Sequence, residues 1–233
     1  MNQVYGLIGR RNFLRLMGVM GSGMAGTIAG LTWNTHPAHA DEGLSPDSAL
    51  QQLLAGNQRF VWHKPDYPHQ SAKRLQEVAS AQHPFATVLS CADSRVPVEL
   101  IFDAGVGDLF DIRVAGNIVT PEVLGSLEYA AALLGTPLIM VLGHEHCGAV
   151  TAAVQNEPLP GSIGSLVKAI KPAVGRVKET GNDRVELAVV ENVRYQIERM
   201  QQKSPVLTQL VAAGKLKVVG GRYDLDTGEV TLV

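Results

Sequence analysis

Two cysteines and one histidine are the residues most able to hold a metal ion. The 233-residue chain has only two cysteines, Cys91 and Cys147, and His144 lies three residues before the second. Thiolate and imidazole are common ligands of zinc. A structural zinc site uses four protein ligands, whereas three protein ligands leave the fourth position free for catalysis. These residue types therefore predict one Zn²⁺ per chain, held by Cys91, His144 and Cys147.

A carboxylate and a guanidinium follow the first cysteine closely, at Asp93 and Arg95. Arginine can pair with aspartate through two hydrogen bonds, which fixes the carboxylate and keeps it ionised. We expect Asp93 and Arg95 to form a catalytic dyad that orients a zinc-bound hydroxide. Asp93 would also be able to swing into the fourth position and close the site. The simpler alternative is that the pair only stabilises the conformation of its loop.

Short apolar strands must bring these distant residues to one place. We expect strands at residues 85–90, 109–114, 137–142, 216–223 and 229–233. We expect helices at residues 45–62, 72–80, 98–102, 120–134, 146–155, 162–180 and 183–203, with another short helix from 204. Continuous apolar strands that alternate with helices indicate an α/β fold with a mostly parallel central sheet flanked by helices. The turn at 226–228 predicts a C-terminal antiparallel edge hairpin.

The strand ends explain how the ligands would meet. Cys91 and His144 each follow a predicted strand directly. In parallel sheets, binding sites form at the carboxyl ends of the strands. We therefore expect both residues at one edge of the sheet, within a single domain that spans residues 41–233.

The first forty residues are typical of an export signal. Residues 10–15 read RRNFLR, an apolar, glycine-rich stretch follows to about residue 32, and residues 37–40 read PAHA. This order predicts a twin-arginine signal peptide cleaved after Ala40, and hence a periplasmic protein without a stable membrane span. An uncleaved membrane anchor is the alternative. Export in the folded state would allow zinc to be loaded first, which would protect both thiols.

The composition limits the classes of molecule that the protein is expected to bind. The formal net charge is −2, and the sequence contains no run of lysine or arginine. A nucleic-acid-binding protein normally carries a basic patch or stripe, so we expect no nucleic-acid partner.

The motifs together resemble the beta-class carbonic anhydrases of bacteria. The resemblance rests on CADSRVP at 91–97, RVAGN at 113–117, GHEHCGA at 143–149 and GNQRF at 56–60. It implies reversible hydration of carbon dioxide to bicarbonate and a proton by a zinc lyase, with the ligands and dyad named above. Two positions depart from the common pattern, Ala92 in place of serine and Glu145 in place of a small hydroxyl residue. Neither is an expected ligand.

The same resemblance implies a role for two further residues. Gln82 occupies the position of a substrate-orienting glutamine, and Phe110 that of an aromatic residue in the apolar substrate pocket. In the family both lie at a subunit interface, so a homodimer or homotetramer is implied. His146 is a candidate proton relay, although a surface histidine is the simpler interpretation.

Three alternatives share these residues. A related zinc hydrolase would act on carbon disulfide or carbonyl sulfide with the same ligands. A zinc ion or a Cys91–Cys147 disulfide would only stabilise the fold of a binding protein. A cysteine nucleophile beside His144 would leave the other cysteine idle.

Overall fold

The computed structural model describes residues 44–233 except 179, 180 and 182. The expected signal, residues 1–40, lies outside the described residues. Within the described part, no helix is both long and apolar enough to cross a membrane.

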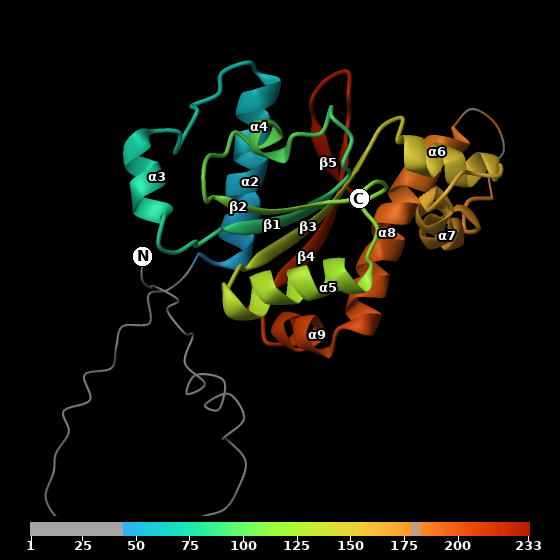
Figure 1. The fold of residues 1–233 in the computed structure, drawn as a ribbon. Coiled ribbons are helices and arrows are strands. Elements are labelled where there is room, and N and C mark those ends of the chain that lie inside the picture. Colours follow the sequence, from blue (N-terminus) through green and yellow to red (C-terminus); the bar gives the residue numbers. More distant parts are fainter. Residues whose placement is uncertain (1–43, 179–180, 182) are drawn as a thin grey trace, which may run out of the picture. The chain divides into compact units, whose positions relative to one another are not determined.

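A five-stranded sheet forms the centre of the fold (Figure 1). Its strands are β1 (Ala86–Ser90), β2 (Leu109–Arg113), β3 (Leu138–His144), β4 (Lys217–Tyr223) and β5 (Val230–Leu232). Their order is β2-β1-β3-β4-β5; the first four run parallel, and β5 pairs antiparallel with β4 at the edge. The expected fold class is confirmed.

Alternate residues of β3 build a hydrophobic core on each face of the sheet. Leu138, Met140 and Leu142 pack against α2 (Pro46–Val61) and α4 (Val98–Ile101). Ile139 and Val141 pack on the opposite face against α5 (Pro121–Glu128), α8 (Arg184–Lys203) and α9 (Pro205–Ala212). Figure 1 shows α2 and α5 on opposite sides of the strands. Because both faces are covered, β3 is apolar at nearly every position, as is usual for a central parallel strand.

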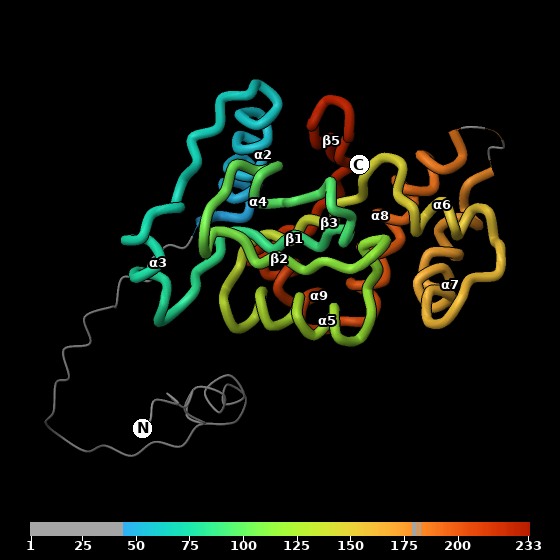
Figure 2. Tube along the Cα trace, turned by 45° about the horizontal axis from the view of Figure 1, so that its top comes forward, coloured from blue at the N-terminus to red at the C-terminus, as the bar shows by residue number. Residues whose placement is uncertain are grey.

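A third core lies beyond the carboxyl ends of the strands. It joins α6 (Gly148–Gln155), α7 (Ile163–Val174) and the first half of α8, and it includes the side chains of Cys91 and Cys147. Both ribbon and tube views place α6 and α7 side by side next to α8 (Figure 2). The two cysteines are thus enclosed on this side by the helices α6, α7 and α8.

The ends of several elements differ from the prediction. β3 continues through His144, and α6 begins only at Gly148 because His146 has a left-handed φ of 50° that a helix cannot include. The helix from Pro121 ends as a π-helical turn, η1 (Tyr129–Leu133), before Gly135 with φ 72°. The remaining short helix is α3 (Ala72–Val78), and α7 ends at Val174 instead of continuing to residue 180.

Candidate active site

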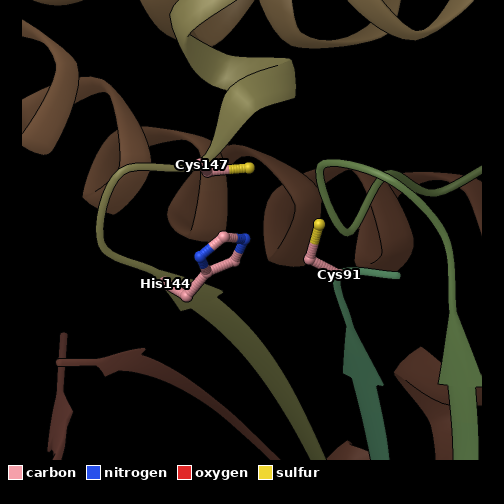
Figure 3. A group of neighbouring side chains, drawn as sticks. All are labelled: Cys91, His144 and Cys147. Atoms are coloured by element: carbon pink, nitrogen blue, oxygen red, sulfur yellow. The ribbon is translucent and has the colours of Figure 1, made fainter. Parts of the chain in front are cut away.

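Cys91, His144 and Cys147 come together as a cluster of possible metal ligands. One ligand atom from each lies within 4.8 Å of the other two, and all three residues are buried. Figure 3 shows their side chains converging from the end of one strand, the end of its neighbour and the turn before a helix. Among the described residues this is the only such cluster of three.

Strand register explains the meeting of residues 53 positions apart. Leu89 of β1 pairs with Val141 of β3. Continuing this parallel register by two residues brings Cys91 level with Gly143, next to His144. The turn after β3 then places Cys147 directly before α6. The N–H groups of Val150 and Ala149 at the start of that helix act to lower the pKa of Cys147, against larger effects that raise it.

His144 is arranged as a ligand through its Nε2 atom. Its Nδ1 lies 2.8 Å from the carbonyl oxygen of Glu145, to which it donates. The opposite nitrogen, Nε2, is buried and has no hydrogen-bond partner. A buried polar atom without a partner is costly, and a metal ion would satisfy it. The donor set of two thiols and one imidazole suits zinc, so the residues fit this metal.

The two thiols influence one another. Both are unpaired and buried, so the alternative of a Cys91–Cys147 disulfide finds no support in this geometry. The Cys147 thiol, placed to donate to the Cys91 sulfur, lowers the pKa of Cys91, and His144 and the Gly116 N–H lower it further. The pKa of Cys147 is raised by the same pairing with Cys91 and by burial. The pocket therefore favours at least one thiolate before any metal binds.

Asp93 and Arg95 form the expected pair. The Asp93 carboxylate accepts from the Arg95 main-chain N–H at 2.9 Å, from Nε at 3.0 Å and from Nη2 at 2.9 Å. The Arg95 guanidinium holds the pKa of Asp93 well below its usual range. One Asp93 oxygen lies 3.9 Å from His144 Nε2, which places the carboxylate beside the cluster without a direct hydrogen bond.

Arg113 supports the Asp93 loop from the neighbouring strand, a role that sequence reasoning did not identify. It donates from Nη2 to the Asp93 carbonyl at 2.6 Å and from Nε to the Cys91 carbonyl at 3.2 Å. It stands at the end of β2, which is paired with the end of β1. The RVAGN motif could have indicated this role, because it places an arginine at the end of a strand, at the same edge of the sheet as Cys91.

Gln82 and Phe110 lie away from the cluster of their own chain. Phe110 pairs with Thr87, four residues before Cys91, which corresponds to about 13 Å along the strand. Its ring centroid is 6.1 Å from that of Tyr129, a neighbour that sequence reasoning missed. Gln82 is exposed and precedes β1, so the whole strand separates it from Cys91.

The GNQRF motif serves the fold. Asn57 is buried and donates to the carbonyls of Ile101 and Gly228, and its oxygen accepts from Val230 N. It thereby ties α2 to α4 and to the C-terminal hairpin. Arg59 of the same motif pairs with Asp103, and neither contact reaches the cysteine cluster.

Charged residues hold the turn between His144 and Cys147. Glu145, the departure from the family pattern, has its carboxylate 3.3 Å from Arg222 and accepts from Leu225 N at 3.2 Å. Arg222 also donates to Glu186, which accepts from His146 N. Arg222 therefore offsets only part of the negative charge of Glu145, because it also pairs with Glu186 and Asp224. The His146 side chain is 71% exposed and lies within 4 Å of the Glu145 and Glu186 carboxylates, as expected of a surface histidine.

Comparisons with known proteins agree on one family. The family model described as "Carbonic anhydrase" matches residues 86–230. "Carbonic anhydrase 2" of Mycobacterium tuberculosis is 39% identical over 192 residues, covering 81% of this chain and 93% of the relative. The carbonic anhydrase of Mycolicibacterium smegmatis is 38% identical over the same coverage. Among solved structures, the beta-carbonic anhydrase CcaA is similar with a TM-score of 0.65 and 30% identity, covering 78% of this chain and 94% of that one.

Proposed function

This chain belongs to the beta-class carbonic anhydrases and hydrates carbon dioxide, and we propose that it does so with one zinc ion held by Cys91, His144 and Cys147. The observation that carries the proposal is the buried triad, whose ligand atoms lie within 4.8 Å of one another while His144 Nε2 has no other partner. Zinc bound there would supply the Lewis acidity that activates water near neutral pH.

Asp93 and Arg95 prepare the attack on carbon dioxide. The carboxylate stays ionised because Arg95 pairs with both of its oxygens. It therefore accepts a hydrogen bond from the attacking water and directs the oxygen lone pair at the substrate. Because Arg95 engages both Asp93 oxygens, the carboxylate would orient a water molecule instead of binding the metal itself.

A second copy of the chain completes the substrate pocket in this proposal. Gln82 and Phe110 do not approach Cys91 of their own chain, yet the family pattern assigns them to substrate. They would act on the site of a partner chain in a homodimer or homotetramer. Phe110 and Tyr129 would line an apolar wall for carbon dioxide, and the Gln82 amide would orient it.

The N-terminal residues would direct the protein to its compartment. We propose that residues 1–40 are a twin-arginine signal removed after Ala40, and that residues 41–233 are the single catalytic domain of a periplasmic enzyme. The support is the order of the RRNFLR motif, the apolar stretch and the PAHA site. Cytoplasmic zinc loading would protect two thiols that are both buried at the cluster.

Metal analysis and stopped-flow hydration test the zinc mechanism together. We expect one zinc per purified chain, and hydration that is lost with zinc and restored by it. Asp93→Asn should keep the zinc but lower kcat about a hundredfold or more, because a neutral amide is a weaker hydrogen-bond acceptor than a carboxylate. Asp226→Asn, in the exposed hairpin turn, is the matched control and should hydrate at the parent rate.

Two outcomes would contradict the mechanism. If the parent enzyme were active without zinc, the metal would have no part in the mechanism. An unchanged hydration rate in Asp93→Asn would show that the Asp93–Arg95 dyad has no part in the mechanism. The alternative substrates, carbon disulfide and carbonyl sulfide, find no support in the names of the relatives above, which are carbonic anhydrases.

A further inference from the structure

A main-chain N–H points at one of the metal-binding sulfurs. Gly116 N lies 3.3 Å from Cys91 Sγ, and both residues are buried. Gly116 has φ 74°, and a Cβ at this position would lie 2.6 Å from Ile170 Cδ1. A side chain would therefore have to displace the end of the Ile170 side chain or shift the loop. Position 116 requires glycine for both its backbone conformation and its close packing.

Two buried amides of α8 hold the loop that carries Gly116. Asn192 Nδ2 donates to the Gly116 carbonyl at 2.9 Å. Gln196, one helical turn later, accepts from Val119 N at 2.9 Å and donates to Asn192 Oδ1 at 3.0 Å. The exposed fractions of Asn192 and Gln196 are 1% and 0%. Burying polar groups at such positions is costly unless every hydrogen bond is made, and here the bonds lead to Gly116.

We propose that Asn192, supported by Gln196, is a positioning residue that fixes the Gly116 N–H on the Cys91 sulfur and so tunes the bound metal. The inference rests on the proposed zinc site. A hydrogen bond to a thiolate stabilises its negative charge and reduces the charge that it donates to the metal. Two thiolate ligands would otherwise weaken zinc as a Lewis acid, and this hydrogen bond limits that loss at Cys91.

Asn57 offers a matched control for a purely structural role. It is also buried, with 4% exposure, and its side chain also ties separate main-chain segments together, at Ile101, Gly228 and Val230. None of its partners contacts the cysteine cluster. Replacing either asparagine removes buried hydrogen bonds, but only Asn192 leads to a metal ligand.

The experiment compares Asn192→Ala with Asn57→Ala in the full-length mature enzyme. Zinc affinity is measured by competition with a chelator, and the thiolate-to-metal charge-transfer band is recorded after substitution with Co²⁺. Asn192→Ala should bind zinc about ten- to a hundredfold more weakly, as expected for a residue that orients a ligand. Its charge-transfer band should move to longer wavelength, because the sulfur loses a hydrogen bond. Asn57→Ala should keep the parent affinity and band position.

Parent-like affinity and spectrum in Asn192→Ala would overturn the proposal, as would equal changes in both variants. A second measurement needs no substitution. In the ¹¹³Cd-loaded parent, a scalar coupling between the metal and the Gly116 amide proton is expected across the hydrogen bond, and its absence would contradict the positioning role even if Asn192→Ala failed to fold. A parent that bound no metal would instead contradict the proposed zinc site itself.

Discussion

At the carboxyl ends of β1 and β3, buried ligands meet loops that the same chain holds in place. Arg95 and Arg113 fix the Asp93 loop, and Arg222 fixes the turn after His144. At the amino-terminal half of the sheet the situation differs. Gln82 is exposed, and Phe110 stands on the edge strand β2 with Tyr129 as an aromatic neighbour. One chain thus brings Cys91, His144 and Cys147 together, while Gln82 and Phe110, which we propose act on substrate, lie away from them.

The difference follows from the topology. A parallel sheet gathers residues from distant strands at one edge, so a single chain can build the metal centre there. The open edge of β2 carries backbone groups that a second chain could cover. The comparison teaches that metal binding and substrate binding should respond to different perturbations. Each prediction below tests that separation.

Loss of a ligand should have the largest effect. Cys147→Ser should weaken zinc binding far more than the hundredfold that is typical for residues that only orient ligands, and abolish hydration with it. Gln82→Ala should keep one zinc per chain, although it lowers hydration. Metal content and competition with a chelator measure both. If Gln82→Ala lost its zinc, the two ends of the sheet would not be independent.

Mixed assemblies test whether Gln82 acts on another chain. Gln82→Ala and Asp93→Asn should each lower kcat/KM roughly ten- to a hundredfold or more when alone. Co-expressed as differently tagged chains, the mixed dimer contains one site with Asp93 from one chain and Gln82 from the other. Stopped-flow assays of the purified mixed species should therefore show recovered hydration.

Recovery would be absent if Gln82 served its own chain, because the site with intact Asp93 would then lack it. That result would contradict the proposed shared pocket. Phe110→Ala in place of Gln82→Ala should show the same recovery and provides an independent repeat.

The turn between the two ligands should be sensitive to Arg222. This residue pairs with Glu145, Glu186 and Asp224 at 3.1 to 3.3 Å and is largely buried. Arg222→Ala leaves these carboxylates uncompensated and should lower the free energy of unfolding by about 2 to 3 kcal/mol. Arg194→Ala, which removes an exposed pair on α8, should cost about 0.5 kcal/mol or less. Denaturant unfolding of the two variants compares them, and equal losses would contradict the role of the network.

Asp111 should produce the smallest effect, and one that depends on pH. It lies on β2, where burial, and then the charge of Glu99, raises its pKa to about 6. The unfolded pKa is about 3.9, so the native state is favoured below pH 4 and loses this advantage as the pH rises through 6. Asp111→Asn should therefore stabilise the protein at pH 8 by about 1 kcal/mol, after allowance for partial exposure.

The gain from Asp111→Asn should shrink as the pH falls from 6 through 4, because the parent carboxyl becomes protonated first in the folded state and then in the unfolded state. Thermal unfolding of parent and variant across this range measures it. A gain that does not change with pH would show that Asp111 does not titrate as its burial requires.

The clustering of Cys91 with His144 and Cys147 and the Asp93–Arg95 contact were accessible from sequence because local rules place these residues. Cys91 follows an apolar strand, and Arg95 is two residues from Asp93. The bond between Asn192 and Gly116, by contrast, joins residues 76 positions apart. Helical periodicity could place Asn192 on the buried face of α8 with Val189 and Val193, but no local pattern identifies Gly116 as its partner. The late start of α6 was missed because no local pattern indicates the left-handed conformation of His146, whose N–H donates to the distant Glu186.

X-ray absorption at the zinc edge of the purified enzyme tests the central claim most directly. The account predicts one zinc with two sulfur ligands at about 2.3 Å, one imidazole nitrogen at about 2.0 to 2.1 Å and one further light atom in the open position. In Cys147→Ser, any residual zinc should show a single sulfur. A parent zinc with fewer than two sulfur ligands, or a Cys147→Ser variant with both still present, would contradict the assignment of Cys91, His144 and Cys147.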